Sequence, residues 1–176
     1  MGEELDIGQG VVLYRDTLSL NKNVIRYGTM DYFSEAKGIF NIPRPKTFVD
    51  TPNHCPECQE VEAKAQRNTP DTLTLEEAGD GWADLSSFLS TKGFLYYIPA
   101  FIRLCIASNE ESCYIDNLFF SLIYEDENNR ILQACTQEQK LFMYNFMVWY
   151  KENEAELIEI WLSTEDVEKA IELWSV

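Results

Sequence analysis

The chain of 176 residues contains a single histidine and only 14 lysine and arginine side chains, against 30 aspartate and glutamate side chains. The net charge of −16 repels phosphate groups at long range, which argues against nucleic acid and anionic membranes as partners. Long apolar runs are also lacking, since the longest, Phe94 to Ile106, is too short to cross a bilayer and carries Arg103. We therefore expect a protein that binds neither nucleic acid nor membrane.

Common catalytic signatures are missing as well. The sequence has no glycine-rich phosphate loop, no dinucleotide-binding fingerprint and no metalloprotease motif. A chain with one histidine has few groups suited to acid–base catalysis near neutral pH, and no serine or cysteine nucleophile can be paired with His54 from the sequence. Whether the protein is an enzyme stays open, and the sequence favours a protein without catalytic activity.

The cysteines do not form a disulfide pattern. They are five in number, and Cys105, Cys113 and Cys135 lie in or beside helical apolar patterns rather than at the spacings of a disulfide framework. The first residues contain no basic segment leading into an apolar one, as a secretory signal would. We expect reduced thiols and a cytoplasmic location.

Apolar residues make up 45% of the chain and aromatic residues 13%, which is enough to fill one core. In the second half they recur every three or four residues, as between Tyr114 and Ile123, and Leu141 to Tyr150 is almost wholly apolar. Thr136 followed by Gln139 has the spacing of a helix capping box. The pattern predicts a mainly α, single-domain irregular bundle of about five to seven helices.

The first residues have a different character from the rest. β-Branched and aromatic residues cluster at 11–14 and again at 24–27, with a turn signal between the clusters. We predict a small β-hairpin extension over residues 1–28. A helical domain follows over residues 29–176 and contains a cysteine loop at 50–60. After this loop, residues 61–67 are expected to form one or two helical turns.

The cysteine loop reads His54-Cys55-Pro56-Glu57-Cys58. A Cys-x-x-Cys turn lets two thiolates hold one ion, so we predict a zinc site with His54, Cys55 and Cys58 as ligands. Adjacent side chains do not easily face the same ion, which suggests that His54 and Cys55 need a further ligand from elsewhere. The candidates for that ligand are Asp50, Glu57, Glu60, Cys105, Cys113 and Cys135.

Two other interpretations of this loop stay open. The pair could act as a redox dithiol, but such a motif follows a β-strand and leads into a long amphipathic helix, whereas Thr51-Pro52-Asn53 and a short charged segment flank this one. The loop could also be structural, with Cys55 and Cys58 as small, partly buried side chains. A metal-binding or thiol-redox protein is thus one functional hypothesis.

The leading hypothesis rests on charge. Residues 109–176 hold 15 acidic and 4 basic side chains, a net charge of −11, against −5 for residues 1–108. Such a surface attracts basic proteins at long range, so we expect a non-enzymatic interaction protein of the immunity or inhibitor type that binds a basic protein partner. The sequence does not indicate which oligomeric state the protein has. The pairs Glu76-Glu77 and Glu110-Glu111 are expected to be capping or solvated groups, and most of the aromatic residues to pack in the core.

Several motifs occur in a fixed order along the chain: Pro43-Arg44-Pro45, His54-Cys55-x-Glu57-Cys58, Trp82 and Leu85, Gly93-Phe94-x-Tyr96-Tyr97-x-Pro99-Ala100, and Thr136-x-Glu138-Gln139. In this order and spacing, the chain resembles a bacterial family of small helical proteins whose domain has no assigned function. The resemblance covers roughly residues 30–175. It implies a shared helical fold and the cysteine loop as a family feature, and it implies no reaction.

Overall fold

A computed structural model describes residues 4–6, 12–14, 31–79 and 84–175 of the chain. The chain divides into two compact units, residues 1–31 and residues 32–176.

In the first unit, two short strands pair antiparallel. Strand β1 (Glu4–Asp6) and strand β2 (Val12–Tyr14) are in register, with Leu5 opposite Leu13. The second cluster of β-branched and aromatic residues in the predicted hairpin, at 24–27, lies outside the described residues, as does the turn predicted before it. The hairpin extension over 1–28 therefore stays a prediction.

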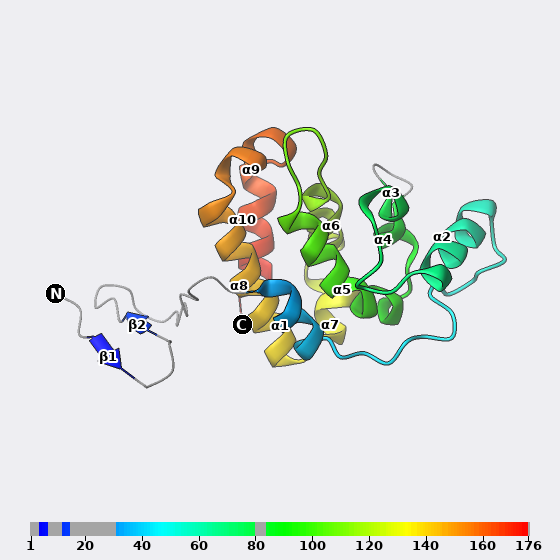
Figure 1. Ribbon diagram of the computed structural model, residues 1–176, viewed down its shortest axis with the longest axis horizontal. Helices are drawn as coiled ribbons and strands as arrows, with labels where there is room; N and C mark the ends of the chain where they lie inside the picture. The colour runs from blue at the N-terminus through cyan, green and yellow to red at the C-terminus, as the bar shows by residue number, and fades with distance from the viewer. Residues whose placement is uncertain (1–3, 7–11, 15–30, 80–83, 176) are drawn as a thin grey trace. The chain divides into compact units, whose positions relative to one another are not determined.

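The second unit is mainly helical, as the apolar periodicity predicted (Figure 1). Its helices are α1 (Tyr32–Ile39), α2 (Pro56–Arg67), α3 (Leu75–Ala78), α4 (Leu85–Phe88), α5 (Thr91–Ile106), α6 (Ile115–Ile123), the 3₁₀ helix η2 (Asp126–Asn128), α7 (Arg130–Ala134), α8 (Gln137–Asn153), α9 (Ala155–Trp161) and α10 (Thr164–Leu173). The described residues thus form ten α-helices rather than five to seven. Helices α3, α4 and α7 have only four or five residues, which is too short to produce an apolar period in the sequence.

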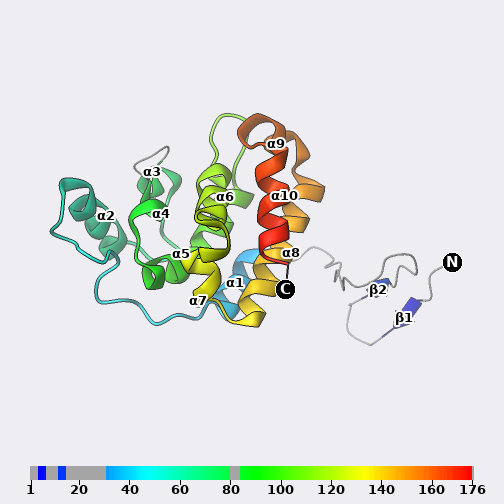
Figure 2. The same ribbon diagram turned by 180° about the vertical axis from the view of Figure 1, so that it is seen from behind.

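Helix α5 is the centre of the core. Its residues are apolar on nearly every side, and it packs against α1, α6 and α7, which surround it in both views (Figures 1 and 2). Phe94 and Phe101 are fully buried and in ring contact, and Phe101 stacks on the buried Tyr114. The helix runs through Pro99 without ending. None of the helices in the described ranges is long and apolar enough to span a bilayer.

Helices α8 and α10 complete the core on the other side of α6. The predicted capping box is confirmed, since the Thr136 hydroxyl accepts from the Gln139 backbone N–H and the Gln139 side chain accepts from the Thr136 N–H. Helix α10 packs against α6 and α8. Trp174, the C-cap of α10, is fully buried and donates from Nε1 to the Leu122 carbonyl oxygen at 3.0 Å.

Helix α2 carries the cysteine loop. We predicted one or two helical turns over residues 61–67, but the helix starts at Pro56 and has 12 residues. It packs against α4, and in both views it lies at the end of the helical unit away from α9 and α10 (Figures 1 and 2). The two surfaces that the sequence singled out, the cysteine loop and the acidic C-terminal helices, are therefore far apart within this unit.

Candidate metal centre

The structure brings His54, Cys55 and Cys58 together. One ring nitrogen of His54 and the two sulfurs all lie within 4.8 Å of one another, and the Cys55 and Cys58 sulfurs are 3.1 Å apart. The expectation that His54 and Cys55, as neighbours in sequence, would not face the same point is therefore wrong. Both cysteines are half-buried and reduced, and His54 is exposed.

This convergence follows from the start of helix α2. The His54 N–H donates to the Thr51 carbonyl oxygen at 3.0 Å, which closes a tight turn before the helix. Cys55 is the N-cap in extended conformation, and Pro56 follows at the first helical position, where its missing N–H removes no helical hydrogen bond. Cys58 then lies one turn further on, where its N–H donates to the Cys55 sulfur at 3.3 Å.

The segment that enters the loop between residues 49 and 55 is tied to α2 by hydrogen bonds. The Glu62 carboxylate accepts from the backbone N–H groups of Phe48 at 2.7 Å and Val49 at 3.0 Å, and the Phe48 side chain is fully buried. The Gln66 amide donates to the Lys46 carbonyl oxygen at 2.8 Å. Because the segment entering the loop and the helix leaving it are joined, the ligand-bearing corner is held in place before any metal binds.

The C-terminal end of α2 is fixed to the core in a similar way. The Tyr97 hydroxyl donates to the carbonyl oxygens of Ala65 and Asn68 at 2.8 and 3.0 Å. The Arg44 guanidinium donates to Asn68 and Gln66, also at their carbonyl oxygens. These bonds give partners to carbonyl oxygens at the last helical turn that have none within the helix. They also anchor α2 at the end opposite the cysteines.

The Cys55 thiol has a pKa above its ordinary value, because it shares a hydrogen bond with Cys58, and a further hydrogen bond with the Glu57 carboxylate acts in the same direction. The pKa of Glu57 is lowered, first by a hydrogen bond from its own backbone N–H and then by the Cys55 thiol. The Cys58 backbone N–H acts in the opposite direction on Cys55, but the net shift of its pKa is upward. An activated redox dithiol has the opposite property, a depressed pKa on its first cysteine.

The donor set fits a zinc ion better than a hard cation. Two sulfurs and an imidazole nitrogen are soft to borderline ligands of the kind that Zn²⁺ takes. A tetrahedral zinc separates two thiolates by about 3.8 Å, so the 3.1 Å between these sulfurs has to widen when the metal binds. The corner can thus bind one metal ion through three side chains.

The other predicted candidates do not join this group. Within the described part of the chain, His54, Cys55 and Cys58 form the one cluster of three or more such ligands. Cys105, Cys113 and Cys135 are buried, and burial raises the pKa of each thiol, that of Cys135 to about 12. These three cysteines behave as core residues.

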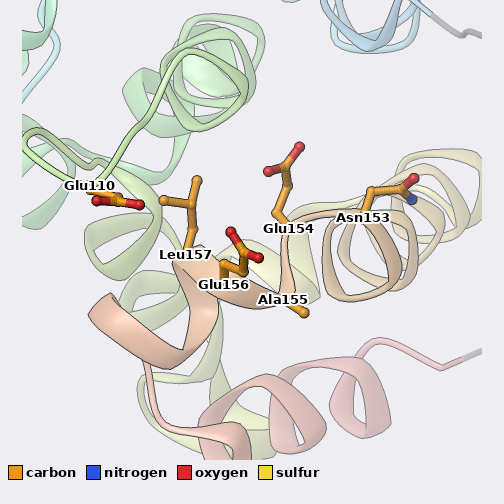
Figure 3. Close-up of a pocket in the computed structure, with 6 residues that line it drawn as sticks. All are labelled: Glu110, Asn153, Glu154, Ala155, Glu156 and Leu157. Atoms are coloured by element: carbon orange, nitrogen blue, oxygen red, sulfur yellow. The ribbon is translucent and has the colours of Figure 1, made fainter.

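A second feature lies at α9. A hollow of about 390 Å³ is lined by Glu110, Asn153, Glu154, Ala155, Glu156 and Leu157. Figure 3 shows Glu110 reaching the hollow from the loop after α5, while Glu154 and Glu156 come from the junction of α8 and α9. Three carboxylates from two separate segments therefore surround one hollow. Ile160 and Trp161 on α9 are also exposed, to 52% and 36%.

Sequence reasoning missed both the anchor at Glu62 and the hollow. Glu62 is one of many acidic residues in an acidic chain, and nothing in its spacing marks it as an acceptor for Phe48 and Val49. Glu110 was expected to be a capping or solvated residue, and its proximity to Glu154 depends on how the loop after α5 packs beside α9. Only the acidic excess over residues 109–176 was visible in the sequence.

Comparisons of the chain with protein-family models, with curated proteins and with solved structures find no match in any of the three. The resemblance to a bacterial family of small helical proteins therefore stays a prediction from the motifs that suggested it.

Proposed function

We propose that this chain is a zinc-binding protein that holds the metal with His54, Cys55 and Cys58. The observation that carries the proposal is the convergence of one imidazole nitrogen and two sulfurs within 4.8 Å at a helix N-terminus. Once zinc has displaced the thiol proton, the Cys58 backbone N–H, which donates to the Cys55 sulfur at 3.3 Å, stabilises the metal-bound thiolate. Exposure of His54 leaves a path for the ion to enter.

The state of Cys55 supports metal binding over dithiol redox chemistry. A redox pair needs a thiolate at neutral pH, and the hydrogen bonds of Cys55 with Cys58 and Glu57 instead favour its protonated form. A zinc ion can displace the thiol proton, because the metal is a far stronger partner for the sulfur than either acceptor. The same two cysteines therefore suit a metal better than an exchangeable disulfide.

The role of the metal is local. All three ligands lie within residues 54–58, so binding closes only a short loop and fixes the corner before α2. The unfolded chain keeps the same three ligands close together, and metal binding to the unfolded state reduces the gain in folding stability. Zinc thus shapes a surface corner of the protein, and the buried core around α5 holds the fold together.

Metal analysis and native mass spectrometry of the purified chain test this proposal. We expect the purified chain to bind one zinc with loss of thiol protons, and Cys58→Ser to lose the metal while keeping its far-ultraviolet circular dichroism spectrum. Gln59→Ser is the matched control, because Gln59 is the exposed neighbour on the same helical turn and is not in the ligand cluster. A wild-type chain that binds no zinc, or a Cys58→Ser variant that binds it equally well, contradicts the proposal.

A second candidate function, favoured by the hollow at α9, is binding of a basic protein. Glu110, Glu154 and Glu156 surround a space of about 390 Å³, which is enough for a lysine or arginine side chain. The exposed Ile160 and Trp161 on the same helix add apolar area of the kind found at interface centres. An arginine-bearing partner segment therefore has both a charged and an apolar contact here.

Two double variants with the same charge change test this candidate. A basic protein captured at low ionic strength should lose affinity about tenfold or more with Glu154→Gln/Glu156→Gln, and binding should weaken as salt increases. The matched control, Glu165→Gln/Glu172→Gln, removes two exposed charges on α10 outside the hollow. Equal losses for both pairs would mean that net charge alone acts, and no loss for either would count against an acidic interface.

A further inference from the structure

The chain supplies no fourth imidazole or thiol to the corner. Its single histidine and all five cysteines lie in the described residues, so every imidazole and thiol of the chain is accounted for. The three remaining cysteines are buried, Cys105 within α5, Cys113 just before α6 and Cys135 at the end of α7. A zinc held as proposed above has therefore used all the soft ligands that this chain offers.

Glu57 lies between the two cysteines in the sequence, and its carboxylate is already engaged. Its carboxylate accepts from its own backbone N–H in the first turn of α2 and from the Cys55 thiol. To bind zinc it would have to leave the backbone N–H at the helix N-terminus, where a carboxylate is favoured. Asp50 and Glu60 do not belong to the ligand cluster, and Glu60 pairs with Lys64 at 2.8 Å.

The corner also faces solvent. His54 is exposed and the two cysteines are half-buried, so the side of the ion that the protein does not cover is open to solvent. Zinc with three protein ligands keeps its fourth position for water or for a group from another molecule. Sites of this kind differ from closed structural sites, in which four side chains surround the metal.

Charge decides which external group is favoured. Two thiolates neutralise Zn²⁺ and a neutral imidazole adds no charge, so the loaded corner has no net charge of its own. Glu57 lies in the first turn of α2, Glu60 follows two residues after Cys58, and Asp50 lies just before the tight turn, so the surroundings are acidic. An anionic fourth ligand would add negative charge to an acidic surface, whereas a neutral nitrogen donor would not.

From these contacts we infer that the zinc at His54, Cys55 and Cys58 keeps an open fourth position that accepts a neutral imidazole from outside the chain, such as an exposed histidine of another molecule. The inference rests on the proposed zinc site. Water occupies the position in the absence of such a donor, and the site discriminates against carboxylates.

Cobalt replacement tests this inference on the full chain. Co²⁺ bound by two thiolates and an imidazole gives sulfur-to-metal charge-transfer bands and visible bands that respond to the fourth ligand. Added imidazole should shift the visible bands with saturation, and acetate at the same concentration should leave them unchanged. The chain with Glu57→Gln should respond to imidazole in the same way as the wild type.

The other outcomes of the cobalt experiment separate failure of this inference from failure of the proposed zinc site. Cobalt bands that imidazole does not change in the wild type, but does change in Glu57→Gln, would show that Glu57 fills the fourth position and would overturn the inference while leaving the metal site intact. Bands insensitive to imidazole in both chains, or shifted equally by acetate, would also overturn it. Absence of charge-transfer bands would remove the zinc site itself, and the inference with it.

Discussion

At the scale of single residues, the five cysteines divide into two classes. Cys55 and Cys58 are half-buried at the start of α2, whereas Cys105, Cys113 and Cys135 are buried, with raised thiol pKa values. Access separates the two classes, because burial blocks the reagent, whereas a raised pKa such as that of Cys55 only slows an accessible thiol. We expect two thiols per native chain to react quickly with Ellman's reagent at pH 8 and three to react only on unfolding.

Zinc should protect the two fast thiols, because metal and reagent compete for the same sulfurs. Counting thiols with and without a chelator, and again in guanidinium chloride, checks both statements. Three or more fast thiols in the native chain would contradict the burial of the core cysteines. Two fast thiols that zinc does not protect would contradict the ligand assignment.

Glu77 gives a pH-dependent prediction. Hydrogen bonds from Arg67 at 2.9 and 3.0 Å lower the pKa of its carboxyl below 4.5 in the folded chain. A depressed folded-state pKa contributes stability above the unfolded pKa, and that contribution is lost as pH falls through the folded value. Glu77→Gln should therefore lower the melting temperature near neutral pH, and the difference from wild type should disappear as pH falls below about 4.5.

The effect of Glu77→Gln should be small and sensitive to salt, since 53% of the Arg67 side chain is exposed. Melting curves from pH 3 to 7 for both chains check this prediction. A difference that grows toward low pH would mean that the folded-state pKa of Glu77 is raised, which would reverse the sign argued here.

The sequence identified functional residues that lie close together along the chain, and it missed those that act on residues far away in the sequence. His54, Cys55 and Cys58 were identified because all three lie within five residues, so local spacing describes most of their geometry. Glu62 was missed because it acts on Phe48 and Val49, and no periodicity records a carboxylate that bonds to backbone N–H groups 13 and 14 residues earlier.

At the scale of elements, one glycine fixes how closely α5 approaches the segment that leads to the metal corner. Gly93 lies in the first turn of α5, and a Cβ there would be 2.5 Å from the Phe48 carbonyl oxygen. The Ser90 N–H donates to the same oxygen at 2.7 Å. Gly93→Ala should therefore destabilise the fold by about 1 to 3 kcal/mol, although alanine is the better helix former.

Gly38→Ala is the matched control, because Gly38 also lies in a helix, α1, and a Cβ there meets nothing within 4 Å. This change should stabilise the chain by about 0.5 to 1 kcal/mol. Urea unfolding of the three chains measures both values. Stabilisation by Gly93→Ala would show that the contact between α5 and the Phe48 backbone is looser than described.

Long helices were more predictable than short ones, of which only α3 had a predicted capping residue, Glu77. Helices α5 and α8 have 16 and 17 residues, so apolar residues and capping signals mark them clearly. Helix α2 was predicted too short because its first turn is polar and contains the cysteines, and helix formation there depends on the Cys55 cap and on Pro56. Helices α3, α4 and α7 depend on tertiary packing.

At the scale of the whole molecule, the negative charge opposes folding as well as attracting partners. The chain carries a net charge of −16, and like charges repel one another more in the compact state than in the unfolded state. Added salt screens this repulsion. We expect the melting temperature to rise by a few degrees between about 10 and 200 mM sodium chloride at pH 7.

Scanning calorimetry at several salt concentrations measures this effect. Glucose at matched osmolarity is the control, because it adds no charge. A melting temperature that falls with salt would indicate that the described ion pairs, such as Lys37 with Asp71 and Lys169 with Asp126, outweigh the general repulsion.

The central claim is that one zinc ion is bound by two sulfurs and one imidazole nitrogen at the start of α2. X-ray absorption at the zinc edge of the loaded chain tests it most directly, because the first shell reports ligand type and distance. The account predicts two sulfur neighbours at about 2.3 Å and nitrogen or oxygen neighbours at about 2.0 to 2.1 Å, including one imidazole. A first shell without sulfur, or one with three or four sulfurs, would contradict it.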